Sequence, residues 1–376
     1  MNILTETPQQ VYSVEQKLEP ERDSNLDLLR GIMLIVMTID HNGGPLKQVF
    51  YETLGFVTAA EGFVYLSGIV FGLVYSKRLA KGFSCIFNAA LKRSAVIYFY
   101  HLLLIAILTM PIWANLLSAQ AISNSIFLAP FSENYPLKLF LYTVFLYQPH
   151  LMDILPMYCI YIFLAPFVLN LFSKNKQLIF FILSGALWLV SQLDIYQLAY
   201  PELGIDMGSF NIFAWQFLFF SGVFIGHLRF KGISILPVNK LLFIAASTLA
   251  LIFFVVNLLF NFEYIDLPDL LIGKPNLGIF RIINFFLIAY SIHYLIKSKI
   301  FFKSQWISFL GKHSLQVFIF HIFCAYFIDF VRHRLGLEYA ITDIVFSFIA
   351  VALLLIPAYL HQYAQKKFPV VKRLGL

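Results

Sequence analysis

The stretch LDLLRGIMLIVMTIDHNGG (residues 26–44) is an apolar run about as long as the ~20 residues that a helix needs to cross a membrane. Two basic side chains interrupt it, Arg30 and His41, eleven residues apart. On a helix they lie within about 20° of the same direction and about 16 Å apart along the axis. Either residue alone would suit an interfacial anchor. Two of them on one stripe at membrane depth predict a functional role.

The rest of the chain has the same apolar character. Hydrophobic residues make up 60% and charged residues 12% of the 376 residues, against about 45–50% and ~25% in soluble domains. This composition argues against a soluble enzyme, a disordered protein and a nucleic-acid-binding domain, in spite of the basic pI of about 9.1. It predicts an all-α polytopic protein embedded in a lipid bilayer. Ten spans are predicted, at 26–44, 57–76, 94–117, 153–172, 178–193, 211–228, 240–260, 278–296, 313–331 and 341–363.

The loops between these spans predict the orientation of the chain. With both termini in the cytoplasm, 20 of the 27 Lys and Arg residues fall on the inner side and five on the outer side, as the positive-inside rule requires. An eleventh apolar stretch, 137–147, is too short to span and is predicted to be re-entrant or interfacial. It lies in the largest outer loop, 118–152, which is long enough to carry structure.

The domain organisation is simple. Residues 1–24 are predicted to be a polar cytoplasmic tail, 25–366 a single transmembrane domain, and 367–376 a basic cytoplasmic tail. No internal repeat divides the domain, and no pattern predicts an oligomeric state.

Four ionisable side chains from four predicted helices fall at the outer end of the bundle: His41, Glu61, Asp153 and Arg281. Asp153 also suits the first turn of a helix, and Arg281 suits a snorkelling position. Glu61 is harder to explain in this way, because a carboxylate on a packed helix face needs a partner.

Other polar residues extend this pattern. Ser314 and His321 are seven residues apart and share a helix face, although a neutral His bonded between helices is the plain alternative. Trp215 lies in the outer half of its span, where it suits an interface anchor. Basic residues concentrate at the inner end, where they predict a mouth that binds anions: Arg30, Lys77, Arg78, Lys92, Arg93 and Lys312. A base outside and an anion-binding mouth inside favour group transfer across the membrane, from a phosphate-bearing cytoplasmic donor to an outer acceptor.

Five motifs resemble those of OpgC, the succinyltransferase of osmoregulated periplasmic glucans, in the acyltransferase type 3 superfamily of ten-helix membrane enzymes. They run in the same order from about 22 to 335: LDLLRGIMLIVMTIDH, GFVTAAEGFVYLSGIVFGLVY, MDILPMYCIYIFLAP, FNIFAWQFLFFSGVFIG and LGKHSLQVFIFH. The Arg30–His41 spacing and the Leu66-Ser67-Gly68 element are shared across the superfamily, whereas the motifs around Glu61 and Asp153 are narrower. The resemblance implies that Arg30 and His41 are essential. It also implies an acyl-CoA donor, a glycan acceptor and a bacterial inner-membrane location.

We therefore expect an O-acyltransferase that moves an acyl group, expected to be succinyl, from acyl-CoA to a periplasmic glucan. His41 is predicted to be the general base, with a transient acyl-His41 intermediate as the open alternative. Glu61 or Asp153 would orient His41 or balance its charge.

The remaining candidate residues are assigned to the substrates. Arg30 would bind the CoA end of the donor, and Arg281 would bind a succinyl carboxylate or the acceptor. Ser67, Ser314, His321 and Trp215 are also expected to line the donor and substrate sites. No metal and no permanently bound cofactor are predicted, because no His, Asp or Glu cluster has ligand spacing.

Two other classes of protein remain as alternatives. A transporter or exporter of a glycan or lipid would also use buried charges near the outer leaflet, although the chain shows no inverted repeat. A structural membrane subunit would have no need of the aligned Arg30 and His41.

Overall fold

A computed structural model of the chain describes residues 22–113, 135–193, 208–234, 236–337 and 339–369, and this part is helical without strands. Eight of the described helices are long and apolar enough to cross a membrane, which confirms an all-α membrane protein. They are α4 (Ala59–Leu79), α5 (Phe83–Trp113), α8 (Ile154–Ser173), α11 (Ile212–Phe230), α12 (Lys240–Asn261), α14 (Ile279–Lys297), α16 (Ser314–Leu335), and the α17 (Ala340–Leu353) and α18 (Leu355–Lys367) pair taken together.

The other two predicted spans also form helices, α2 (Ser24–Asn42) and α9 (Gln177–Ser191). They do not count among the eight. Within its 19 residues α2 carries Asp27, Arg30 and Asp40, and α9 has only 15 residues. The total of ten spans and the orientation of the chain therefore stay predictions.

Three segments differ from the predicted boundaries, and the first is α5, which begins at Phe83, eleven residues before the predicted 94. A short helix that the sequence did not predict, α15 (Gln305–Lys312), packs on α2. The predicted last span is interrupted at Leu354, three residues before Pro357. Proline causes this break, because its ring clashes with the carbonyl four residues earlier. Residues 137–147 do not form a span, as their length predicted: α7 (Tyr135–Thr143) is only nine residues long, and residues 118–134 lie outside the described part.

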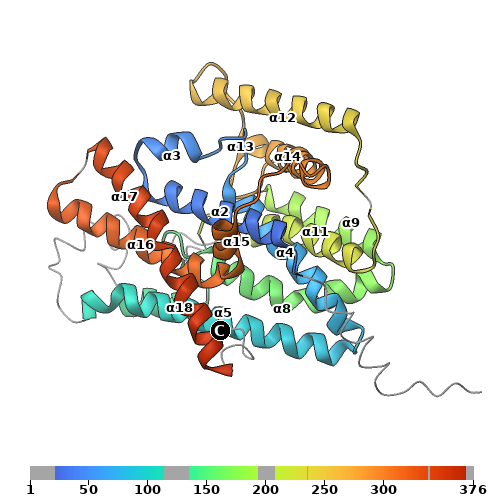
Figure 1. Cartoon of the computed structure of the whole chain (residues 1–376), viewed down its shortest axis with the longest axis horizontal. Coiled ribbons are helices and arrows are strands. Elements are labelled where there is room, and N and C mark those ends of the chain that lie inside the picture. The colour runs from blue at the N-terminus through green and yellow to red at the C-terminus, as the bar shows by residue number, and fades with distance from the viewer. Residues whose placement is uncertain (1–21, 114–134, 194–207, 235, 338, 370–376) are drawn as a thin grey trace, which may run out of the picture.

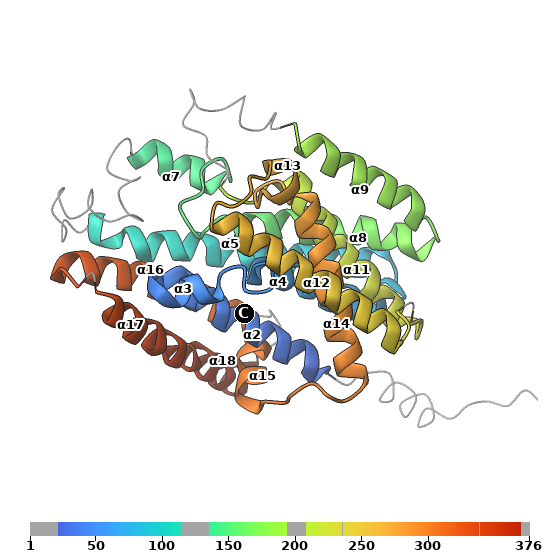
Figure 2. The same cartoon turned by 90° about the horizontal axis from the view of Figure 1, so that it is seen from above.

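The bundle has a layered arrangement (Figures 1 and 2). α12 and α14 pack together on one side of α4 and α11, while α5 and α8 pack together on the other side. α2 lies near the centre, in contact with α4, α15 and α16, and α3 (Gly44–Phe50) follows it directly. α13 (Asp269–Ile272) is a single turn that packs against α14. The large apolar side chains on α12 are mostly exposed, as expected for a helix that faces lipid.

Glycines allow a very close helix contact between α4 and α11. A Cβ atom at Gly68 would lie 2.1 Å from the carbonyl oxygen of Phe219, and one at Gly72 would lie 2.1 Å from that of Val223. Gly222 on α11 meets the α4 backbone in the same way. This is small-residue packing, which lets two backbones touch in a membrane bundle. The glycine face of α4 is therefore used for helix packing.

Both ends of α2 have clear local causes. The Asp23 side chain accepts hydrogen bonds from the N–H groups of Asn25 (2.9 Å) and Leu26 (3.4 Å) and so caps the helix. Gly43 stops it with a positive φ of 74°, which costs a glycine little. The helix that carries Arg30 and His41 is thus held at both ends. Below, the end of the bundle at which α2 begins is called the Arg30 end, and the opposite end is called the His41 end.

Candidate functional site

A cavity of about 510 Å³ lies at the Arg30 end, between α2, α4, α5, α8 and α16. Arg30, Ser67 and Ser314, which the sequence placed on three different helices, all line it. Arg30 donates a hydrogen bond through Nη2 to Ser314 Oγ. The Ser67 hydroxyl accepts a bond of 3.3 Å from Tyr158, another lining residue. The structure therefore brings three of the candidate residues to one cavity.

Arg30 keeps an unused donor. Its Nε–H group is buried and has no hydrogen-bond partner in the described structure. A buried donor without a partner costs free energy, so this position favours a ligand with an acceptor atom. Arg30 lines the cavity inside the bundle, whereas a snorkelling arginine would extend its charged group to the membrane surface.

The lining of this cavity is basic. Arg22, Arg93 and Lys312 line it together with Arg30, against two carboxylates, those of Asp23 and Asp27. Both carboxylates are already paired: Arg22 Nε lies 2.5 Å from Asp27, and Arg229 Nη2 lies 2.5 Å from Asp23. The lining is thus left with an excess of positive charge, which suits an anionic group such as phosphate.

The pairing of Asp23 also shows in its acidity. Burial acts to raise the pKa of this carboxyl group, but the hydrogen bond and charge of Arg229 and the two backbone N–H groups outweigh it. The pKa of Asp23 therefore lies below its ordinary value. The carboxylate stays ionised, holds Arg229, and caps α2 at the mouth of the cavity.

His41 lies at the other end of α2 and meets His321 of α16. Its Nδ1 atom is 3.0 Å from Nε2 of His321, and the two rings stack with centroids 5.1 Å apart. Nδ1 of His321 bonds to the carbonyl oxygen of Phe318, one turn earlier in α16. His321 is 1% exposed, whereas His41 is only partly buried. The two histidines that the sequence placed on separate helices therefore form a hydrogen-bonded pair.

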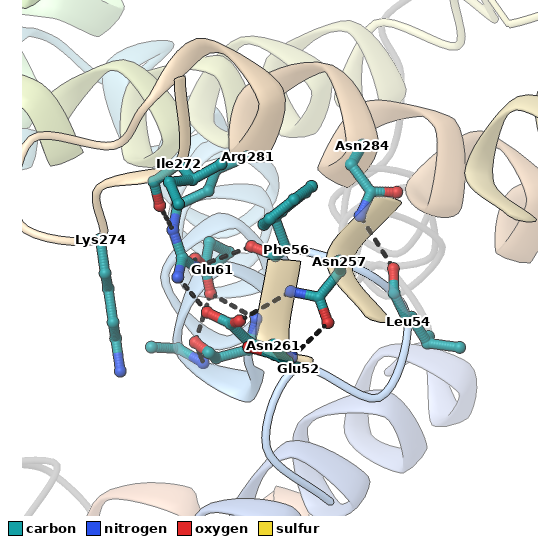
Figure 3. A network of polar contacts seen from close by, with 12 residues as sticks. Glu52, Leu54, Phe56, Glu61, Asn257, Asn261, Ile272, Lys274, Arg281 and Asn284 are labelled. Carbon is teal, nitrogen blue, oxygen red and sulfur yellow. Dashed lines mark hydrogen bonds and ion pairs between the residues drawn. The ribbon is translucent and has the colours of Figure 1, made fainter. Parts of the chain in front are cut away.

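Glu61 and Arg281 form a second cluster at the His41 end (Figure 3). Arg281 Nη1 donates hydrogen bonds to Glu61 Oε1 (2.8 Å) and to the carbonyl oxygen of Phe56 (2.7 Å), while its Nη2 forms an ion pair with Glu52. Glu61 Oε2 accepts from the backbone N–H (2.9 Å) and hydroxyl (2.5 Å) of Thr58 and completes the capping box of α4. Both carboxylate oxygens of Glu61 are thus engaged within this network.

Glu52 of this cluster was not singled out from the sequence. It lies in the short segment between α3 and α4, which has no helical pattern to mark it, and it adopts a positive φ of 54°. Its second oxygen accepts 3.1 Å from Asn257 of α12, so the network ties three helices together (Figure 3). The described contacts of Glu61 and Arg281 are with this network and not with His41.

Asp153 and Trp215 hold loops in the described structure. Asp153 precedes α8 but does not cap it, and its carboxylate accepts 2.7 Å from the backbone N–H of Ser209. Trp215 is fully buried, and its indole N–H donates 3.0 Å to the carbonyl of Pro275. Trp215 is therefore not an interface anchor.

Two aromatic residues that the sequence did not single out lie between the two parts of the site. Phe63 and Phe318 line the cavity, and their rings stack with centroids 5.6 Å apart. The Phe318 ring also lies 4.8 Å from that of His321. A chain with 42 phenylalanines offers no local signal to distinguish these two.

Comparison with known proteins adds the family. No curated protein and no solved structure matches the chain. The sequence model of one family, described as OpgC protein, matches residues 22–366, which include nearly all of the helices described above. Membership of this family indicates a membrane acyltransferase acting on glucans. The match extends over nearly the whole chain, and we conclude that the protein belongs to the OpgC family.

Proposed function

We propose that the protein transfers a succinyl group from cytoplasmic succinyl-CoA to a hydroxyl group of a periplasmic glucan, with His41 as the general base. The observation that carries the proposal is the arrangement along α2. A basic cavity lies at its Arg30 end and a histidine pair at its other end. The choice of succinyl and of a periplasmic glucan rests on the family resemblance.

The cavity supports an acyl-CoA donor. The excess positive charge of its lining would attract the phosphates of CoA, and the spare Nε–H of Arg30 would donate to one of the donor's oxygens. The apolar part of the lining, which includes Val70, Leu155 and Phe219, would contact the elongated pantetheine arm. The ~16 Å between Arg30 and His41 is about the reach of that arm.

The histidine pair supports a base on His41. A carbonyl oxygen can only accept, so Nδ1 of His321 carries a hydrogen and donates it to Phe318. Nε2 of neutral His321 is then an acceptor, and His41 must donate to it from Nδ1. This leaves the lone pair of His41 on Nε2. His321 is a positioning residue that selects the reactive tautomer of His41.

The reaction then balances as follows. His41 Nε2 takes the proton of the glucan hydroxyl while the hydroxyl oxygen bonds to the thioester carbon of the donor. The C–S bond breaks, and the CoA sulfur takes the proton from His41, which returns to its neutral form. The same lone pair would serve the alternative route, in which Nε2 attacks the thioester and forms a transient acyl-His41.

The direction of transfer is part of the proposal. The basic asymmetry of the loops supports a cytoplasmic Arg30 end and a periplasmic His41 end in a bacterial inner membrane. Reporter fusions after residue 376 and within the loop 118–152 test this. We expect a cytoplasmic signal from the first and a periplasmic signal from the second. A periplasmic C-terminus would reverse the placement of both sites.

The chemistry is tested by mass spectrometry of periplasmic glycans from cells with the parent protein, with His41→Ala, or with neither. We expect succinyl additions to the glucan only with the parent protein. Succinyl additions with His41→Ala at the parent level would exclude His41 as the base. Movement of a glycan or lipid by the purified protein without any covalent change would support the transporter alternative instead.

A further inference from the structure

The cavity and the histidine pair are separate spaces, although the proposed reaction needs both. Neither His41 nor His321 is among the residues that line the cavity. What lies between them is aromatic. Phe318 lines the cavity, and its ring also lies 4.8 Å from that of His321 between centroids. Phe63 of α4 stacks on Phe318, with centroids 5.6 Å apart and 17° between the ring planes.

This layer is buried. The exposed fraction is 3% for Phe318 and 5% for Phe63. Tyr158 of α8 packs edge-on against Phe63, at 6.1 Å, and holds Ser67 with its hydroxyl on the cavity side. Three helices thus contribute one aromatic side chain each to the same boundary, and no polar group of these rings faces the histidines.

The layer has a chemical consequence. A general base that removes a proton from a sugar hydroxyl will also remove one from water. The oxygen of a water molecule would then bond to the thioester carbon while His41 Nε2 takes one of its protons. The C–S bond would break, the CoA sulfur would take the proton from His41, and the products would be the carboxylic acid and the CoA thiol. The donor would then be wasted. An apolar layer between the cavity and the base blocks the entry of water from the cavity side and so limits this loss, as water exclusion does in other transfer sites.

We propose that the stacked Phe63 and Phe318 form a gate between the cavity and the His41–His321 pair, which the acyl arm must displace to reach His41 and which otherwise keeps the water of the cavity from the pair. The role in transfer rests on the proposed function, whereas the barrier itself does not. Phenylalanine suits the task, because two χ angles let the ring swing aside without breaking a hydrogen bond. The gate residues are positioning and specificity residues for the donor.

The first arm of the test needs no activity. The purified full-length chain is labelled with diethyl pyrocarbonate, and carbethoxylation of each histidine is measured by mass spectrometry. In the parent, labelling of His321 needs a local opening, so Phe318→Ala and Phe63→Ala should raise it about tenfold or more. Phe220→Ala is the matched control, since Phe220 is 4% exposed but lies on α11 and does not line the cavity. Labelling of His321 that does not exceed the Phe220→Ala level overturns the barrier.

The second arm measures the gate in the reaction. Release of CoA from succinyl-CoA is followed with and without glucan, and the ratio of hydrolysis to transfer is compared between variants. Phe318→Ala should raise this ratio severalfold over the parent and over Phe220→Ala. Phe318→Leu, which keeps most of the volume and is expected to fold if the alanine variant does not, should raise it less. An unchanged ratio in all the Phe318 and Phe63 variants overturns the gate.

The two proposals fail in different ways. If the parent neither transfers nor hydrolyses succinyl-CoA, the proposed donor is wrong, and the labelling of His321 still decides whether the barrier exists. If the parent transfers normally and the labelling of His321 is unchanged in the alanine variants, the function stands and the gate is wrong.

Discussion

Replacement of His321 tests the histidine pair most directly. His321→Leu removes Nε2 of His321, the acceptor that lies 3.0 Å from His41 Nδ1. The leucine fills the site, where His321 is 1% exposed, with an apolar side chain of similar size. The hydrogen bond is worth ~1 kcal/mol while His41 is neutral and ~1.5–3 kcal/mol once His41 becomes charged. The difference, ~0.5–2 kcal/mol, is lost from the transition state. We expect kcat to fall about 2- to 30-fold.

The assay is the initial rate of transfer from succinyl-CoA to glucan by the purified protein, with kcat and KM separated. The KM for succinyl-CoA should stay near the parent value, because His321 does not line the cavity. His321→Gln should retain part of kcat, since its amide oxygen can accept from His41. His101→Leu is the control: this histidine is as fully buried, but it bonds to Tyr142 and stacks on its ring.

A double-mutant cycle decides between this account and a structural role. His41→Ala alone should lower kcat by about 10²–10⁴. His321→Leu added to it should cost nothing further, because the residue it positions is gone. The positioning role would be refuted if His321→Leu lowered kcat by the same factor in the His41→Ala protein as in the parent. It would also be refuted if the His321→Leu protein had the kcat of the parent.

Three further outcomes are expected. Arg30→Ala should weaken equilibrium binding of acyl-CoA, measured by isothermal titration calorimetry, by about tenfold or more, and Arg30→Lys should restore only part of it; equal affinities would remove Arg30 from the donor site. Glu61→Gln should destabilise the protein by ~3 kcal/mol, seen as a lower thermal unfolding midpoint. Glu52→Gln should destabilise it less, because Glu52 is the more exposed of the two carboxylates that pair with Arg281. An unchanged midpoint for Glu61→Gln would show that its charge is not needed for folding. Gly72→Ala should destabilise by ~1–3 kcal/mol through overpacking, whereas Gly185→Ala, whose Cβ would meet nothing within 4 Å, should not; similar midpoints for the two variants would contradict the close contact of α4 and α11.

Much of the fold could be predicted from the sequence, because the signal for it is local. A run of about 20 apolar residues has few stable choices in a membrane other than a helix, and eight predicted spans correspond to helices of sufficient length and apolarity. The 3.6-residue period also placed Ser314 and His321 on one face of α16. α15 was missed because its eight residues are too few to stand out between two longer apolar runs.

The partners of the candidate residues were decided only by the tertiary structure. Periodicity tells which residues share a helix face, but which helix lies opposite depends on the rotation and vertical offset of each helix pair. The sequence predicted that Glu61 or Asp153 would meet His41. In the structure the described partner of His41 is His321, and Glu61 is held by Thr58 and Arg281. The predicted catalytic roles of Glu61 and Asp153 stay predictions.

The sequence by itself determined the helical membrane class, the common stripe of Arg30 and His41, and the resemblance to the OpgC family. The tertiary structure decided that Arg30 faces a cavity with Ser67 and Ser314, that His41 bonds to His321, and that Phe63 and Phe318 lie between them. The physical reason is the range of the forces involved. Helix formation in lipid is determined within a segment, because each backbone group bonds four residues away. A site between helices depends on how all their side chains pack, and that packing is set by the whole bundle.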